Sequence, residues 1–198
     1  MRNDMIKKTV TLIFLSIICF NANSQITFMR AAQDGDANAQ YKLGKMYSQD
    51  NKYQKNIETA VKWYKKAADQ NQKDAAFALG ELYYQGIEIE KNYHLAFKYF
   101  NQADTLGMYE ASFCLGEMYE NGVGVNKNIQ TAFNYYKKAA DKGNLAKAMF
   151  KTGTMLYYGQ GCKKDIPKGI NYIKLAFNEG YPTALEFWNK EELWQYED

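Results

Sequence analysis

The chain has 198 residues, with 25 basic and 22 acidic side chains, a formal net charge of +3 and one histidine. This nearly neutral balance gives no strong positive field for binding nucleic acid or an anionic membrane. A lone histidine and three cysteines, scattered along the chain, do not match the close ligand spacing of a structural zinc site, so no metal or cofactor is expected.

Residues 1–24 are typical of a secretory signal peptide. Basic residues precede an apolar run over residues 9–20, which is shorter than the roughly 20 residues that a membrane-spanning helix needs. Small residues then occupy 22–24, the positions that a signal peptidase recognises. We expect cleavage after Ser24 and export to the periplasm or the exterior, leaving no membrane span.

A second interpretation of the leader is a lipoprotein signal in which Cys19 is acylated. The bulky Ile17 and Ile18 stand where that signal requires small residues, so cleavage after Ser24 is favoured. Removing residues 1–24 leaves 22 basic and 21 acidic side chains. The exported chain is then almost neutral, which again argues against a nucleic-acid partner.

The rest of the chain repeats with a period of 36 or 37 residues. The repeat is marked by Leu43-Gly44, Leu79-Gly80, Leu115-Gly116 and Thr152-Gly153. An alanine stands five residues before each of these glycines and an aromatic residue three before. Such a period is the signature of a repeat protein. We divide it into four units at 36–71, 72–107, 108–143 and 144–180.

Each unit is predicted to contain two helices. In the first unit, Ala39, Leu43 and Tyr47 follow one another at four-residue spacing, which puts them on one helical face. The glycine inside this helix costs about 1 kcal/mol relative to alanine. Its recurrence indicates that the second helix packs too closely to leave room for a Cβ atom.

The glycine-rich segment of the third unit, NGVGVNKN at 121–128, superficially resembles a phosphate-binding loop. A dinucleotide fingerprint would require glycine at Lys127, and a P-loop would require Gly-Lys-Ser or Gly-Lys-Thr. No predicted strand precedes the glycines. We therefore interpret Gly122 and Gly124 as the turn between two helices.

The ends of the array are predicted to be caps. Residues 25–35 match the second-helix pattern and form a half repeat, whereas 181–198 begin like a fifth unit and then become acidic. Repeat arrays need such polar-faced caps for solubility.

The third unit, from Ala111 to Gly143, resembles the Sel1-like repeat, a relative of the tetratricopeptide repeat, almost throughout. Thr152 and Leu156 depart from the pattern in the fourth unit, where the family has leucine and tyrosine. The resemblance implies an all-α fold, a right-handed α-solenoid of helix-turn-helix units. It also implies that one face of the first helices lines a concave groove.

That face carries the candidate partner-binding residues. We expect an aromatic and acidic groove that binds an extended peptide or a partner helix, with rings as anchors and carboxylates selecting basic groups. The alternative is that the aromatic residues mainly pack against neighbouring first helices. The predicted groove residues are Tyr41, Lys45, Phe77, Glu81, Tyr84, Phe113, Glu117, Glu120, Phe150 and Tyr157.

Residues for catalysis are sparse. His94 is expected at the surface, and neither Ser48 nor Ser112 is followed by the lysine of a Ser-x-x-Lys nucleophile. Cys114 and Cys162 occupy different repeat positions, so we expect two unpaired thiols. We therefore favour an exported, non-enzymatic interaction module that scaffolds or inhibits a protein partner. The alternative, which the resemblance to cysteine-rich relatives implies, is a peptidoglycan- or β-lactam-related protein.

The leader interpretation makes a direct prediction. Protein recovered from the envelope or medium of the producing cells should begin at Gln25, because a signal peptidase cuts after small residues. Intact-mass measurement and N-terminal sequencing check this. A recovered chain that still contains residues 1–24, or one acylated at Cys19, would contradict it.

Overall fold

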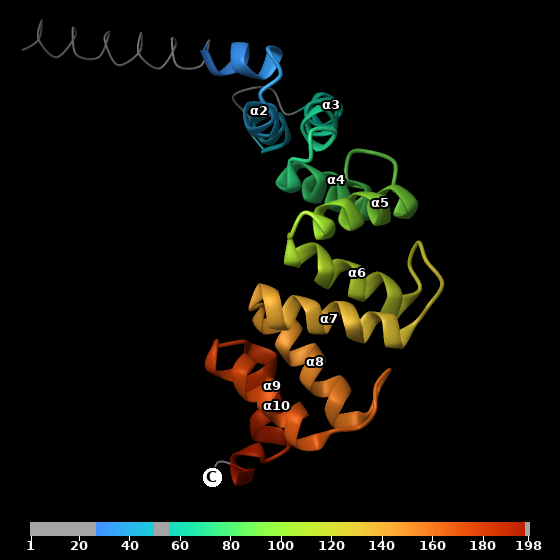
Figure 1. Cartoon of the computed structure of the whole chain (residues 1–198), viewed down its shortest axis with the longest axis vertical. Coiled ribbons are helices and arrows are strands. Elements are labelled where there is room, and N and C mark those ends of the chain that lie inside the picture. The colour runs from blue at the N-terminus through green and yellow to red at the C-terminus, as the bar shows by residue number, and fades with distance from the viewer. Residues whose placement is uncertain (1–26, 50–55, 197–198) are drawn as a thin grey trace, which may run out of the picture. The chain divides into compact units, whose positions relative to one another are not determined.

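The computed structural model describes residues 27–49 and 56–196 (Figure 1). The predicted signal peptide, its cleavage site at Ser24 and the alternative at Cys19 lie outside these residues. Within the described part the regular structure is helical throughout, as the repeat pattern predicted. The helices fall into two compact units that divide between Gln72 and Lys73.

The first unit contains one helical pair and a preceding helical segment over residues 27–33. The pair consists of α2 (Ala37–Gln49) and α3 (Ile57–Ala68). Ala32, from the preceding segment, is fully buried and joins Ala39 and Leu43 of α2 in a small apolar core. This segment therefore covers one side of the first pair.

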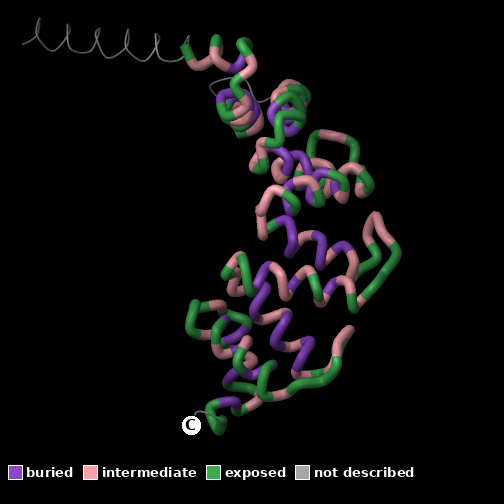
Figure 2. The backbone as a smooth tube through the Cα atoms, in the orientation of Figure 1, coloured by how far each residue is buried: buried purple, intermediate pink, exposed green. Residues whose placement is uncertain are grey.

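The second unit contains three helical pairs and a terminal segment. Its elements are α4 (Lys73–Gln85), α5 (Tyr93–Thr105), α6 (Tyr109–Asn121), α7 (Ile129–Gly143), α8 (Ala146–Tyr158), α9 (Ile166–Asn178), α10 (Pro182–Lys190) and the short 3-10 helix η2 (Leu193–Tyr196). Each of α4, α6 and α8 packs most closely on the helix that follows it, and α5 on α6 and α7 on α8 join successive pairs. Helices paired in sequence order confirm the predicted α-solenoid class. Figure 2 shows the buried residues along the helices and the exposed ones in the connecting turns.

Asparagine or aspartate begins the second helix of every pair. Asn56, Asn92, Asn128 and Asp165 each accept a hydrogen bond from the backbone N–H three residues later. This contact satisfies one of the N–H groups that a helix start leaves without a partner, and it is worth about 1 kcal/mol. The repeated N-cap fixes where each second helix begins.

The mid-helix glycines allow each pair to approach closely. A Cβ atom built on Gly116 of α6 would lie 2.6 Å from the Tyr136 ring of α7, and Gly44 and Gly80 face Tyr64 and Phe100 in the same way. Contacts this short do not occur between real Cβ atoms and rings. The prediction that these glycines admit the second helix is therefore confirmed.

The turn glycines have a second role besides reversing the chain. Gly124 has φ +71°, and its Cβ position would lie 2.9 Å from the carbonyl oxygen of Tyr93 at the start of α5. Gly161 meets Ile129, at the start of α7, in the same way. The glycine-rich turn of one pair thus packs on the preceding pair, which supports the turn interpretation over a phosphate loop.

One buried polar link joins α5, α6 and α7. Asp104 is only 6% exposed, and it accepts a hydrogen bond from the buried Ser112 hydroxyl. The Lys138 ammonium lies 2.7 and 2.8 Å from its two carboxylate oxygens. The charge of Asp104 is thereby compensated at the junction between two pairs.

The glycine–ring contact predicts a coupled effect on stability. Gly116→Ala should lower the free energy of unfolding by about 1–3 kcal/mol, because the added methyl group overpacks against Tyr136. Urea denaturation of Gly116→Ala, Tyr136→Ala and the double variant measures it. The double variant should lose about 0.5–3 kcal/mol less than the sum of the single losses. Strict additivity, or a Gly116→Ala protein as stable as the parent, would contradict the packing.

Candidate functional site

The predicted groove residues are divided between the two units. Tyr41 and Lys45 lie on α2, where Lys45 also lines a pocket of about 450 Å³. The other eight lie on α4, α6 and α8 of the second unit. We call the second-unit surface that carries Glu81, Glu117, Glu120 and their charged neighbours the first-helix face.

The aromatic residues of the predicted groove pack within their own pairs. The Phe77 and Phe113 rings lie 5.6 and 5.2 Å from the rings of Phe100 and Tyr136 on the following helices, and Tyr41 pairs with Tyr64 in the same way. Phe113 is 6% exposed, so little of it is available to a partner. These rings therefore stabilise their own pairs, and Phe113 also packs with residues of the next first helix, α8, in one apolar cluster.

Phe150 and Tyr157 of α8 belong to the C-terminal packing. The Phe150 ring lies 5.7 Å from the rings of both Tyr181 and Phe187. Tyr157 makes edge contacts with Tyr158 and Phe187. The segment after α9 thus covers the fourth position of the predicted aromatic stripe.

Glu120 is held in a fixed arrangement. Its carboxylate accepts a hydrogen bond from the Tyr136 hydroxyl at 2.5 Å and forms an ion pair with Lys151 at 3.0 Å. Partial burial alone would raise the pKa of Glu120, but the hydrogen bonds from Tyr136 and Lys151 outweigh it and lower that pKa. Glu120 therefore stays ionised and links α6 to α8.

Glu81 and Glu117 are in a different state. Burial raises the pKa of both carboxyl groups, and the Lys147 ammonium only partly offsets the shift. The Glu81 side chain remains exposed to solvent. Its pKa is therefore raised by the nearby helices and not by full enclosure in the protein. In the described part of the chain, neither carboxylate forms an ion pair.

Two lysines that the sequence analysis missed complete the first-helix face. Lys147 lies with its ammonium 4.1 Å from the centre of the Phe113 ring, and Lys151 pairs with Glu120. Both residues lie outside the helical face from which the groove residues were chosen. A long lysine side chain nevertheless reaches across to a neighbouring face of the helix. The face is therefore acidic on α4 and α6, and α8 adds two lysines to the aromatic and acidic surface that the sequence predicted.

The other polar candidates offer little for catalysis. Ser112 is fully buried against Asp104. The Ser48 hydroxyl donates to the Lys45 carbonyl oxygen at 2.9 Å and lies 3.0 Å from the Tyr64 hydroxyl. His94 is exposed on α5. Among the described residues, no cluster of three His, Cys, Asp or Glu side chains could hold a metal ion.

The two cysteines of the described chain are free thiols. Burial raises the pKa of Cys114 to about 12, with the nearby Glu117 charge adding to the shift. Burial also raises the pKa of Cys162, whose thiol points to the Met155 carbonyl oxygen at 3.5 Å. Both thiols are therefore poor nucleophiles at neutral pH. No helix of the described residues is sufficiently long and apolar for a bilayer span.

Comparison with protein families identifies four consecutive matches to the Sel1 repeat. They cover residues 37–72, 73–108, 110–144 and 146–181. No curated protein matches the chain in sequence.

Solved structures give the same architecture. A protective antigen of uropathogenic Escherichia coli with an SLR fold is 26% identical, with a TM-score of 0.79 over 85% of this chain and 36% of its own. A Sel1 repeat protein from Oxalobacter formigenes is also 26% identical, with a TM-score of 0.73 over 83% of this chain and 47% of its own. Cysteine rich protein B of Helicobacter pylori is 26% identical, with a TM-score of 0.53 over 67% of this chain and 95% of its own. This chain thus spans less than half the length of the first two proteins.

The raised pKa of Glu117 predicts a pH-dependent gain from its removal. A raised folded-state pKa contributes stability that is complete below the unfolded-state pKa and is lost as the pH rises through the folded-state pKa. At neutral pH the ionised carboxylate therefore destabilises the fold, and Glu117→Gln should raise the melting temperature by about one or two degrees. The gain should shrink as the pH falls to about 4.

Thermal melts at several pH values, followed by circular dichroism, measure this difference. Glu186→Gln, at an exposed position of α10, is the matched control and should leave the melting temperature nearly unchanged. A Glu117→Gln protein that is less stable than the parent at neutral pH would show that this carboxylate supports the fold.

Proposed function

The chain belongs to the Sel1 repeat family, and we propose that it is a non-enzymatic protein-binding module whose first-helix face binds a partner peptide or helix. Repeat arrays of this class expose extended surfaces to which neighbouring repeats contribute in turn. We also propose that the protein is exported, with residues 1–24 as its signal peptide.

The observation that carries this proposal is the pair of only partly compensated carboxylates, Glu81 and Glu117, on α4 and α6. Partly buried charges without an ion pair cost stability, and the fold already satisfies Glu120 through Tyr136 and Lys151. Glu81 and Glu117 have no such partner among the described residues, and burial raises the pKa of both. A cationic side chain of a bound protein would supply the missing charge.

The distribution of charge on the face favours an elongated partner. Glu81, Glu117 and Lys147 lie on three successive first helices, α4, α6 and α8. A peptide laid across these helices would place a basic group near the carboxylates. Such complementarity speeds association.

The same face offers partly buried rings as apolar contacts. Phe77 and Tyr84 of α4 are half-buried, and the Tyr84 ring lies 5.5 Å from that of Tyr93. Because their own pairs hold these rings in place, a partner would not have to order them on binding. Phe113 and Phe150 instead contribute the packing beneath the face.

A peptidoglycan- or β-lactam-related activity gains no support from this site. Ser112 is buried and bonded to Asp104, and the two thiols have raised pKa values. A binding role, as scaffold or inhibitor, requires none of these groups.

Site-specific photocrosslinking in the producing cells tests the proposal. Benzoylphenylalanine in place of the exposed Gln85, one turn after Glu81 on α4, should yield a discrete crosslinked partner, whereas the same probe at the exposed Glu179 should not. Glu117→Lys should abolish the crosslink at 85, because it reverses the charge offered to the partner. The matched reversal Glu186→Lys should leave it unchanged.

The variants are first compared by circular dichroism, so that loss of the crosslink is measured only on folded protein. No crosslink at position 85 in folded protein that keeps both carboxylates, or a crosslink that survives Glu117→Lys undiminished, would reject the first-helix face as the binding surface.

A further inference from the structure

A second concave feature of the second unit lies between α7 and α9, on the second helices of their pairs. It is a pocket of about 730 Å³ bounded by α7, the turn before α9 and the first residues of α9. Its lining includes the apolar residues Phe133 and Leu156, the latter from α8 and largely buried. Three lysines, Lys137, Lys163 and Lys168, outnumber the one acidic residue of the lining, Asp165. None of the residues of the first-helix face lines it.

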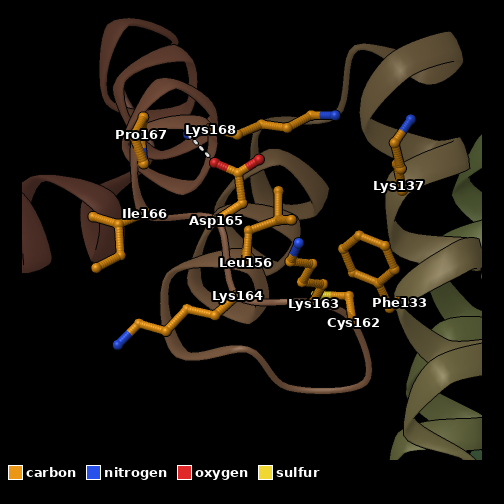
Figure 3. Close-up of a pocket in the computed structure, with 10 residues that line it drawn as sticks. All are labelled: Phe133, Lys137, Leu156, Cys162, Lys163, Lys164, Asp165, Ile166, Pro167 and Lys168. Carbon is orange, nitrogen blue, oxygen red and sulfur yellow. Dashed lines mark hydrogen bonds between the residues drawn. The ribbon is translucent and has the colours of Figure 1, made fainter.

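Figure 3 shows how the lysines lie around this pocket. Lys168 extends from α9 toward α7, where Lys137 lies opposite, and Lys163 points upward beside Phe133. Lys164 points away. Three ammonium groups from three segments therefore surround one space that has an apolar floor.

The surrounding sequence is strongly basic. Residues 121–178 contain ten lysines and only two acidic residues, Asp141 and Asp165, whereas residues 73–120 contain three lysines and eight acidic residues. Asp141 pairs with Lys137. In the described part of the chain, Lys163 and Lys168 form no ion pair, although the charge of Lys168 is among the causes that lower the pKa of Asp141.

The repeat pattern shows that the fold does not require these two lysines. The position of Lys163 is held by Glu90 in the second repeat and by Asn126 in the third. The third repeat has Thr131 at the position of Lys168. The turn and the start of the second helix therefore form with acidic, neutral or basic side chains at these two positions. The fold does not account for the positive charge of Lys163 and Lys168.

We propose that this pocket is a second binding site, which takes an acidic peptide segment carrying apolar side chains from a protein partner. The lysine ammonium groups would pair with carboxylates of the peptide, and an apolar side chain would pack on Phe133 and Leu156. Lysine suits this ligand because its flexible point charge follows carboxylates at variable spacing. The site is separate from the first-helix face and does not depend on the function proposed for that face.

The shape and local chemistry favour a peptide over other anionic partners. A flat bilayer surface does not fill a concave pocket, and none of the large exposed apolar side chains, such as Trp194 and Tyr196, lines it. The N-terminus of α9 is not the anchor, because Asp165 already accepts the N–H of Lys168 and Pro167 has no N–H to offer. Specificity would come from the lysine side chains.

Fluorescence anisotropy on the full chain tests the proposal with three labelled eight-residue peptides. One alternates Glu with Leu, one Gln with Leu and one Glu with Ser. The Glu-Leu peptide should bind saturably and more tightly than both others, because only it offers both carboxylates and apolar groups. Raising the salt from about 50 to about 200 mM should weaken it, because partly exposed charge pairs are screened.

The decisive variant carries Lys163→Asn and Lys168→Thr, the residues that the third repeat holds at these positions, and should fold as the parent does. It should bind the Glu-Leu peptide at least about fivefold more weakly. The matched control Lys142→Asn with Lys190→Thr, at two exposed lysines outside the pocket, removes the same charge. It should bind within about twofold of the parent.

The proposal would be overturned if the Glu-Leu peptide did not bind saturably, or if the Gln-Leu peptide bound equally well. An equal loss of binding in the control variant would also overturn it. So would lysine-dependent binding to phosphatidylglycerol vesicles without peptide binding. The last result would assign the lysines to a lipid surface. Formation of a dimer that is lost with Lys163 and Lys168, in place of peptide binding, would assign them to a second copy of the chain.

Discussion

The structure depends on the close approach of two helices at one glycine in each pair. Because Gly44, Gly80 and Gly116 have no side chain, an aromatic ring of the following helix lies directly on their backbone. This ring fills the space between the two helices. The aromatic residue three positions before the glycine packs against the same ring. Each pair is thus a compact unit whose outer surfaces are free to vary.

This freedom explains why two surfaces of the second unit differ so much in chemistry. The first-helix face combines carboxylates on α4 and α6 with lysines on α8, whereas the pocket between α7 and α9 is rimmed by lysines. The pocket lysines take no part in the glycine–ring contact, whereas Glu120 of the first-helix face accepts a hydrogen bond from the Tyr136 hydroxyl. Burial leaves the pKa of Glu81 and Glu117 raised, so the ionised forms of these two carboxyl groups do not stabilise the fold.

The fold was largely predictable from the sequence because the residues that determine it recur with the repeat. The mid-helix glycines and the aromatic rings that face them recur at one spacing in the first three pairs, so this spacing alone identified the helices. The surface was less predictable. Lys147 and Lys151 reach the first-helix face from positions that were not assigned to it. The burial of Phe113 depends on Tyr136 and Lys147, which only the packing of the helices brings together. Sequence spacing gives the direction of a Cα–Cβ bond, but it does not give the reach of a long side chain.

The buried link of Asp104 to Ser112 and Lys138 has a consequence for how such an array can change by duplication and recombination. The position of Asp104 is held by Ala68 in the first repeat and by Ala140 in the third. The carboxylate therefore comes from the second repeat, and its partners Ser112 and Lys138 come from the third. A second repeat moved elsewhere in the order would bury a carboxylate against neighbours that cannot neutralise it. A rearrangement that keeps this charge compensated must therefore move the second and third repeats together.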